Sequence, residues 1–131
     1  MEKRNLGNTG TKVGALGIGA MSFSDFYGPT NTQESHAILK MALDNGIDHI
    51  DTAKVYGMGL SEERIGQFLN TLNPKDRQFF KIATKGGIDR KNFDDKGTVV
   101  FDNSKEFLTE ELNNSLRRLG VDCVELYYVH R

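Results

Sequence analysis

The feature of this sequence that most constrains its fold is a repeated alternation between short apolar runs and amphipathic stretches with helical spacing. The apolar runs predict four strands, at residues 15–20, 47–51, 79–85 and 121–129. The amphipathic stretches predict three helices, at residues 32–45, 61–72 and 104–119. This alternation is typical of right-handed β-α-β units and a parallel sheet. The sequence therefore predicts an α/β fold of four parallel strands alternating with three helices.

The ends of the predicted helices carry recognisable capping residues. The residues able to accept hydrogen bonds from the first turns are Asn31 or Thr32, Ser61 and Ser104. Gly46 and Gly120 follow the last turns of the first and third helices, where glycine commonly ends a helix. Helical spacing predicts that the first helix buries Ile38, Met41, Ala42 and Asn45.

Two segments lie outside this alternation. Residues 2–7 and 11–17 flank Asn8-Thr9-Gly10, and this pattern predicts a β-hairpin before the first parallel strand. Residues 86–103 predict a long polar loop. Loops of that length in compact domains are usually functional lids or disordered segments.

Composition excludes several classes of function. The formal net charge of −1 gives no electrostatic case for binding nucleic acid or an anionic membrane surface. No apolar run is long enough to span a bilayer, and residues 1–7 lack the apolar core of a signal peptide. Cys123 is the one cysteine, which favours a reducing cytoplasm, and we expect it to be a small core residue without a metal. We expect a cytoplasmic protein with a small-molecule or protein partner.

Four polar residues lie just after predicted strands. Asp51 ends the second strand, Lys85 the third and His130 the fourth, and Tyr56 follows Asp51 in a glycine-rich loop. Sites in parallel α/β sheets form at the carboxyl ends of the strands, so we expect these side chains to converge. A phenol with a pKa near ~10 needs a nearby cation to stabilise its anion. The set therefore suits proton donation to a carbonyl oxygen.

Each of these residues also has an ordinary structural interpretation. Asp51 could cap a turn, Tyr56 could pack over the sheet, Lys85 could be a solvated loop end, and His130 could be structural. Their shared placement at one end of successive β-α units is what favours the joint functional interpretation.

Several other candidates carry less weight. We interpret His36 and His49 as structural, because neither lies after a strand. Gly57-Met58-Gly59 lacks the full dinucleotide-binding fingerprint. The aromatic residues Phe23, Phe26 and Tyr27 could line an apolar substrate pocket or could equally anchor their loop.

At these same residues the chain resembles the aldo-keto reductase family. The run from Gly46 to Gly66 is similar to the family's motif around its active-site aspartate and tyrosine. Ala83-Thr84-Lys85 is similar to the segment with the catalytic lysine, and residues 126–131 to the segment with the active-site histidine. The opening residues 4–10 and 16–19 resemble the hairpin that closes the barrel bottom and the first barrel strand. Residues 26–29 and 127–131 are similar to the corresponding segments of microbial aldehyde, pyridoxal and aryl-alcohol reductases.

The resemblance implies a (β/α)8 TIM barrel and NADP(H)-dependent reduction of a small-molecule carbonyl substrate. It implies that Tyr56 is the proton donor, that Lys85 activates it, that Asp51 pairs with Lys85, and that His130 orients the carbonyl. Ala20, Met21 and Asp51 match positions that line the cofactor site. Residues 1–131 would form the N-terminal half of such a barrel, without the half that holds most of the cofactor.

This departure from the family pattern has consequences for the isolated chain. A half-barrel leaves two unpaired strand edges and an uncovered inner face, and such surfaces favour self-association. We therefore expect self-association and little activity from these 131 residues alone. A non-catalytic regulatory module, such as a channel-associated subunit of this fold, is the alternative function, and an inactive fragment is a third.

Overall fold

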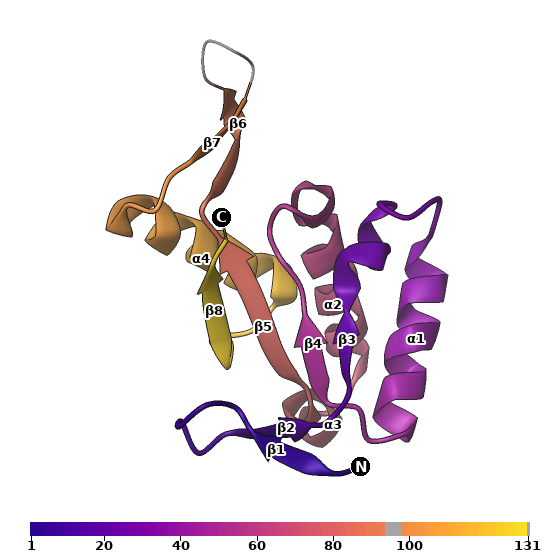
Figure 1. Cartoon of the computed structure of the whole chain (residues 1–131). Coiled ribbons are helices and arrows are strands. Elements are labelled where there is room, and N and C mark those ends of the chain that lie inside the picture. Colours follow the sequence, from indigo (N-terminus) through magenta and orange to yellow (C-terminus); the bar gives the residue numbers. More distant parts are fainter. Residues whose placement is uncertain (94–97, 131) are drawn as a thin grey trace.

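A four-stranded parallel sheet forms the centre of the fold (Figure 1). The computed structural model describes residues 1–93 and 98–130, so Arg131 and residues 94–97 of the predicted loop lie outside it. The strands follow the order β3-β4-β5-β8. Their bounds are β3 (Gly17–Gly19), β4 (His49–Asp51), β5 (Lys81–Gly86) and β8 (Leu126–Val129). All three neighbouring pairs are parallel, which confirms the topology predicted from the alternation of strands and helices.

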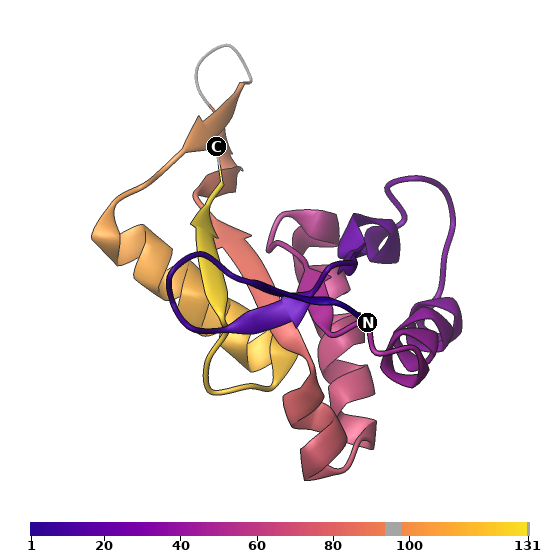
Figure 2. The same cartoon turned by 60° about the horizontal axis from the view of Figure 1, so that its bottom comes forward.

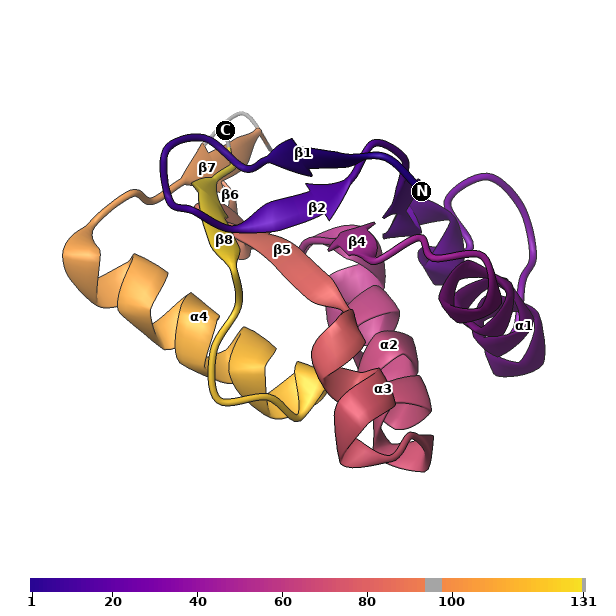
Figure 3. The same ribbon diagram turned by 90° about the horizontal axis from the view of Figure 1, so that it is seen from below.

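The helices lie on one side of this sheet (Figure 3). The three long ones are α1 (Thr32–Asp44), α2 (Leu60–Thr71) and α4 (Lys105–Leu119). A short fourth helix, α3 (Pro74–Phe79), begins where Asn73 accepts a hydrogen bond from the backbone N–H of Asp76. The fully buried core between helices and sheet includes Leu39, Ile50, Ile65, Leu69 and Leu119. The opposite face of the sheet carries the inward-pointing residues of the strands.

The predicted hairpin lies across the amino ends of the parallel strands (Figures 2 and 3). Its strands are β1 (Lys3–Asn5) and β2 (Lys12–Gly14), which pair in antiparallel register. Asp48, just before β4, fixes the hairpin to the sheet. Its buried carboxylate accepts hydrogen bonds from Lys3 and, at 2.6 Å, from the backbone N–H of Gly14. The hairpin therefore closes the end of the sheet opposite to the predicted site.

The segment predicted as a long polar loop contains regular structure. Residues 88–93 and 99–101 form an antiparallel ribbon of β6 (Ile88–Phe93) and β7 (Val99–Phe101). The ribbon projects beyond the carboxyl ends of the parallel strands (Figure 1). The loop was predicted, wrongly, because polar residues dominate this stretch. The two strands are defined by backbone hydrogen bonds across the ribbon and not by a buried apolar face.

Two of the three predicted N-caps are confirmed. The side chain of Asn31 accepts a hydrogen bond from Glu34 N–H at 2.9 Å, and that of Ser104 accepts one from Phe107 N–H at 3.3 Å. Ser61 does not cap α2, which begins at Leu60 directly after Gly59. The Ser61 hydroxyl is buried and donates instead to the Ala20 carbonyl at 2.8 Å.

Two burial predictions were wrong. On α1 the buried residues are Ser35, Leu39 and Ala42, whereas Ile38 and Met41 are exposed. The true buried face is rotated toward the small residues because α1 packs closely against α2. Cys123, expected in the core, is exposed in the connection that precedes β8.

A close approach of α2 and α4 generates a prediction about stability. A Cβ atom at Gly66 would overlap the backbone carbonyl oxygen of Arg118, which no side-chain rotation can relieve. Overpacking of this kind costs about 1–3 kcal/mol, more than the ~1 kcal/mol that alanine gains over glycine in a helix. We therefore expect Gly66→Ala to lower the midpoint of the urea transition followed by circular dichroism.

Gly19→Ala is the matched control for this substitution. A Cβ atom at Gly19 would meet no atom within 4 Å, and its backbone φ of −86° suits alanine. Its urea midpoint should equal or slightly exceed that of the unchanged chain. Equal midpoints for both variants would show that the contact between α2 and α4 relaxes without cost.

Candidate active site

Lys85 is the centre of the polar group at the carboxyl ends of the strands. It lies on β5 and points to the inner face of the sheet, the same face as Asp51 on the neighbouring β4. Its ammonium forms an ion pair with the Asp51 carboxylate and donates to the Thr52 carbonyl at 2.8 Å. It also donates to the Tyr56 phenol oxygen at 3.5 Å. Three oxygen atoms from two segments thus hold a lysine whose side chain is 13% exposed.

A strained turn presents the Tyr56 side chain to Lys85. Tyr56 begins the 3-10 turn η2 (Tyr56–Gly59), in which Gly57 and Met58 have φ values of 64° and 56°. Glycine is needed at position 57, because an added Cβ would lie 2.8 Å from Ser24 Cβ and 2.9 Å from Leu60 Cβ. This contact packs η2 against η1 (Ala20–Ser24), the turn that follows β3. The glycine-rich loop therefore fixes the position of a tyrosine.

His130 lies beside Tyr56 at the end of β8. Its backbone N–H donates to the Gly86 carbonyl at 2.6 Å, which extends the pairing of β5 and β8 by one bond. The His130 and Tyr56 ring centroids are 6.1 Å apart, with the rings nearly perpendicular at 89°. Burial, and then the charge of Lys85, lower the pKa of His130, and the charge of Asp51 opposes this shift only in part. The imidazole is therefore neutral at neutral pH.

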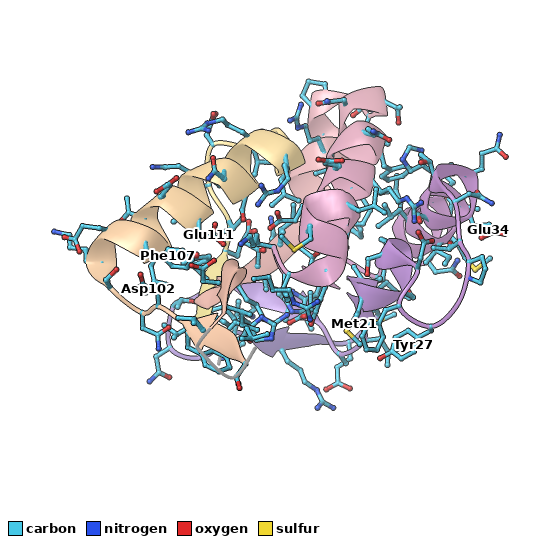
Figure 4. All side chains as sticks on the ribbon, turned by 90° about the horizontal axis from the view of Figure 1, so that it is seen from above. Met21, Tyr27, Glu34, Asp102, Phe107 and Glu111 are labelled. Atoms are coloured by element: carbon cyan, nitrogen blue, oxygen red, sulfur yellow. The ribbon has the colours of Figure 1, made fainter. Side chains whose placement is uncertain are left out.

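An open cavity of about 370 Å³ lies in front of Tyr56 and His130. Apolar side chains form much of its wall, namely Met21, Phe26, Val55, Met58 and Ile88. Figure 4 looks onto this end of the molecule, with Met21 and Tyr27 on the side of the turn after β3 and Glu111 and Phe107 on the side of α4. The cavity is large enough for a small organic molecule.

The structure thus brings together the four residues Asp51, Tyr56, Lys85 and His130, although their catalytic roles stay predictions. The residues predicted to line a cofactor occupy different positions. Met21 lines the cavity, and the Asp51 side chain is 36% exposed on the inner face. Ala20 is fully buried, and its carbonyl accepts the Ser61 hydroxyl, so it lies behind Met21.

The other residues considered from the sequence lie at different places in the structure. Phe26 lines the cavity, Phe23 is buried in the core, and Tyr27 lies over a separate hollow beside α1. His36 and His49 each bond a backbone carbonyl, of Arg64 and Lys81 respectively, which agrees with structural roles.

Sequence reasoning missed two contributors to the site. The Thr52 carbonyl binds Lys85, but a backbone acceptor leaves no side-chain signal in the sequence. Ile88 and Arg90 line the cavity from β6, and residues 88–93 carry no alternation of apolar and polar residues that could have identified them.

Fold and site together define a parallel α/β protein with a Tyr-Lys-Asp-His group at the carboxyl ends of its strands. The chain belongs to the aldo/keto reductase family, whose model matches residues 15–131. It is 35% identical over 128 residues to "Aldo-keto reductase yakc [NADP(+)]" of Schizosaccharomyces pombe, covering 98% of this chain and 36% of the relative. It is 34% identical over 131 residues to "Aldo-keto reductase YhdN" of Bacillus subtilis, covering 99% and 38%.

Solved structures show the same relationship. An aldo-keto reductase of Bacillus halodurans in its holo form superimposes with a TM-score of 0.82 at 35% identity, over 99% of this chain and 40% of that one. These neighbours confirm that the fold is part of a TIM barrel, in agreement with the predicted N-terminal half. The chain spans less than half the length of the relatives and structures that it matches.

The described residues contain neither a membrane-spanning helix nor a metal-binding cluster. No helix among them is long and apolar enough to cross a membrane. Within residues 1–93 and 98–130, no cluster of histidine, cysteine, aspartate and glutamate is arranged to hold a metal ion.

The surroundings of His130 predict its titration. Because burial and the Lys85 charge lower its pKa, the His130 ring signals in an NMR titration should shift at a lower pH than those of an unperturbed histidine near ~6.5. Lys85→Met removes the one lowering charge and should raise the midpoint. Asp51→Asn removes the one raising charge and should lower it further.

The lowered pKa of His130 also makes the free energy of unfolding depend on pH. A histidine with a lowered pKa resists protonation in the folded state, so its contribution to stability is complete at high pH. That contribution falls as the pH drops through the unfolded-state value. A His130 midpoint that stays unchanged in both variants would contradict the electrostatic account.

Proposed function

We propose that this chain carries the proton-transfer part of an NADP(H)-dependent reductase that converts aldehydes or ketones to alcohols. The observation that carries the proposal is the hydrogen bond from Lys85 to the Tyr56 phenol, beside a neutral His130, at a cavity. Membership of the aldo/keto reductase family supports it. The proposal concerns the whole barrel to which these residues would belong.

The hydrogen bond from Lys85 to Tyr56 determines which of the two can donate a proton to a substrate. A lysine ammonium has donors only, so the phenol oxygen accepts the bond from Lys85 and its own O–H stays free to donate. A carbonyl oxygen placed in the cavity can receive that proton as negative charge develops on it. The Lys85 ammonium stabilises the phenolate that remains, and Asp51 keeps the lysine in place.

His130 supports the same step as a neutral donor. Its lowered pKa keeps the ring uncharged, so one ring nitrogen can hydrogen-bond the carbonyl oxygen without competing with Tyr56 as a stronger acid. Both rings line the same cavity, so a carbonyl group in it can reach both side chains. His130 therefore orients the substrate and Tyr56 donates the proton.

The described residues also fit one end of a nicotinamide cofactor. Met21 and the half-exposed carboxylate of Asp51 lie next to the proton donor, where a nicotinamide ring would be held. When bound, the nicotinamide supplies the hydride, and the protein positions it. Ala20 would act by supporting Met21 from behind. The name of the Schizosaccharomyces pombe relative specifies NADP(+), and two further relatives are named L-galactose dehydrogenase (Arabidopsis thaliana) and D-threo-aldose 1-dehydrogenase (Pseudomonas sp).

Substitution of the proton donor tests the proposal. The chain is joined after Arg131 to the remaining barrel of the Bacillus subtilis relative, and this fusion is called the completed barrel. NADPH oxidation is then followed with a panel of aldehydes. Tyr56→Phe should lower kcat by about 10²–10⁴-fold, the usual contribution of general acid catalysis. Tyr27→Phe, which removes an exposed hydroxyl outside the cavity, should leave kcat unchanged. Equal activity of both variants would refute the assignment of Tyr56, and no turnover at all would favour the regulatory module.

The isolated chain should behave differently from the completed barrel. In the described part of the chain, β3 and β8 are edge strands, and Leu16, Tyr128 and Val129 are exposed large hydrophobic residues beside or within them. We expect the 131-residue chain to self-associate in sedimentation velocity and to show little NADPH oxidation. The completed barrel should sediment as a smaller, discrete species. A monodisperse monomer that unfolds cooperatively would contradict this expectation.

A further inference from the structure

The cavity in front of Tyr56 has a single permanent charge in its wall. Its lining residues are apolar or neutral except for Arg90, which is exposed and lies on β6. None of the ion pairs found between described residues involves Arg90. An arginine that lines a cavity and forms no ion pair with the described carboxylates is suited to bind an anionic ligand.

The ribbon places this arginine at a defined position. Ile88 and Arg90 are two residues apart on β6, so both side chains lie on the same face, and both line the cavity. Asp89 between them points to the other face and is buried. The base of the ribbon is fixed by the hydrogen bond from Asp102 N–H to the Gly87 carbonyl at 2.9 Å. An added Cβ at Gly87 would lie 2.8 Å from the His130 carbonyl, so the ribbon begins in close contact with the site.

The remaining charges near the cavity cancel. The Lys85 ammonium is paired with the Asp51 carboxylate, and the nearest acid of the loop after η1, Asp25, lies 3.7 Å from Arg64. His130 is neutral because burial and the Lys85 charge lower its pKa. The charge presented to a molecule in the cavity is therefore the positive charge of Arg90, opposed by no free carboxylate among the lining residues.

The geometry points to a substrate class. We propose that Arg90 binds the carboxylate of an aldehyde whose apolar body lies along Phe26 and Met58 and whose carbonyl group reaches Tyr56 and His130. This inference rests on the proposed reductase function. The cavity volume of about 370 Å³ suits a molecule the size of a substituted benzaldehyde. Arginine matches a carboxylate with two parallel hydrogen bonds, so the interaction selects against a neutral group of the same shape.

Two substrates of nearly equal shape test this preference in the completed barrel. They are 4-formylbenzoate, which carries the carboxylate, and 4-formylbenzamide, its neutral counterpart. The unchanged protein should have at least a tenfold higher kcat/KM for the benzoate. Arg90→Gln should lower kcat/KM for the benzoate by about 10–100-fold, the range expected for a hydrogen bond to a charged group. The value for the benzamide should change less than twofold.

Two control variants sharpen the result. Arg90→Lys keeps the charge but loses the paired donors, so it should restore part of the benzoate preference. Lys12→Gln removes an exposed positive charge from β2 at the opposite end of the sheet and should change neither substrate. If Lys12→Gln and Arg90→Gln have equal effects, the preference reflects the overall charge of the protein and the proposal is wrong.

A binding experiment separates this inference from the proposed function. The chain contains four methionines, of which Met21 and Met58 line the cavity, whereas Met1 and Met41 lie elsewhere. Titration of the methyl-labelled completed barrel with 4-(hydroxymethyl)benzoate should shift the signals of Met21 and Met58 but not those of Met1 and Met41, and Arg90→Gln should abolish the shifts. Such binding without turnover would leave the anion site standing and refute the reductase function. Turnover without any carboxylate preference would refute the anion site and leave the reductase function standing.

Discussion

The interaction on which this half-barrel most depends is the burial of the Glu62 carboxylate. Glu62 is fully buried in the first turn of α2, where it accepts hydrogen bonds from Thr84 Oγ1 at 2.6 Å and from Arg118 Nε at 2.6 Å. One side chain thus joins α2, β5 and α4. A buried carboxylate without a partner is very costly, so loss of Arg118 would destabilise the fold far more than loss of an exposed ion pair. The α2-α4 contact and the charge pairing form one unit, because Arg118 also supplies the carbonyl oxygen that lies against Gly66.

The same arginine connects this buried pair to the candidate site. An added Cβ at Gly59 would lie 2.7 Å from Arg118 Cδ, so the arginine side chain packs directly beneath the turn that begins with Tyr56. A second ion pair holds the other end of this loop, where Lys54 Nζ lies 2.9 Å from Glu111 Oε2 in a geometry that does not suit a hydrogen bond. The first pair joins α2 to α4 beneath the tyrosine loop, and the second joins the loop itself to α4. The position of the phenol relative to Lys85 is therefore set by contacts on the helical side of the sheet.

These contacts explain which features the sequence could predict. Asp51, Lys85 and His130 were placed correctly because parallel pairing alone brings strand ends together, whatever packs around them. Ser61 was predicted to cap α2, but its hydroxyl donates to the Ala20 carbonyl. Glu62 can be explained from the sequence as a residue favoured by the helix dipole, but its carboxylate accepts a hydrogen bond from Arg118. Ala20 and Arg118 lie far along the chain, so the local sequence contains no information about either contact. The buried face of α1 was misplaced for the same reason. Burial there depends on small residues facing α2, and an apolar pattern favours Ile38 and Met41 instead.

The site and the stability of the chain thus depend on different parts of the barrel. Tyr56, Lys85, Asp51 and His130 come from consecutive β-α units, and every bond that positions them is made by residues of this chain. By contrast, the outer edges of β3 and β8 pair with no further strand among the described residues, and Tyr128 and Val129 in β8 are exposed. The second half of a barrel would therefore be needed to cover these surfaces, but not to bring Tyr56, Lys85, Asp51 and His130 together. The arrangement of these four side chains is consequently complete in a chain whose described part leaves two strand edges uncovered.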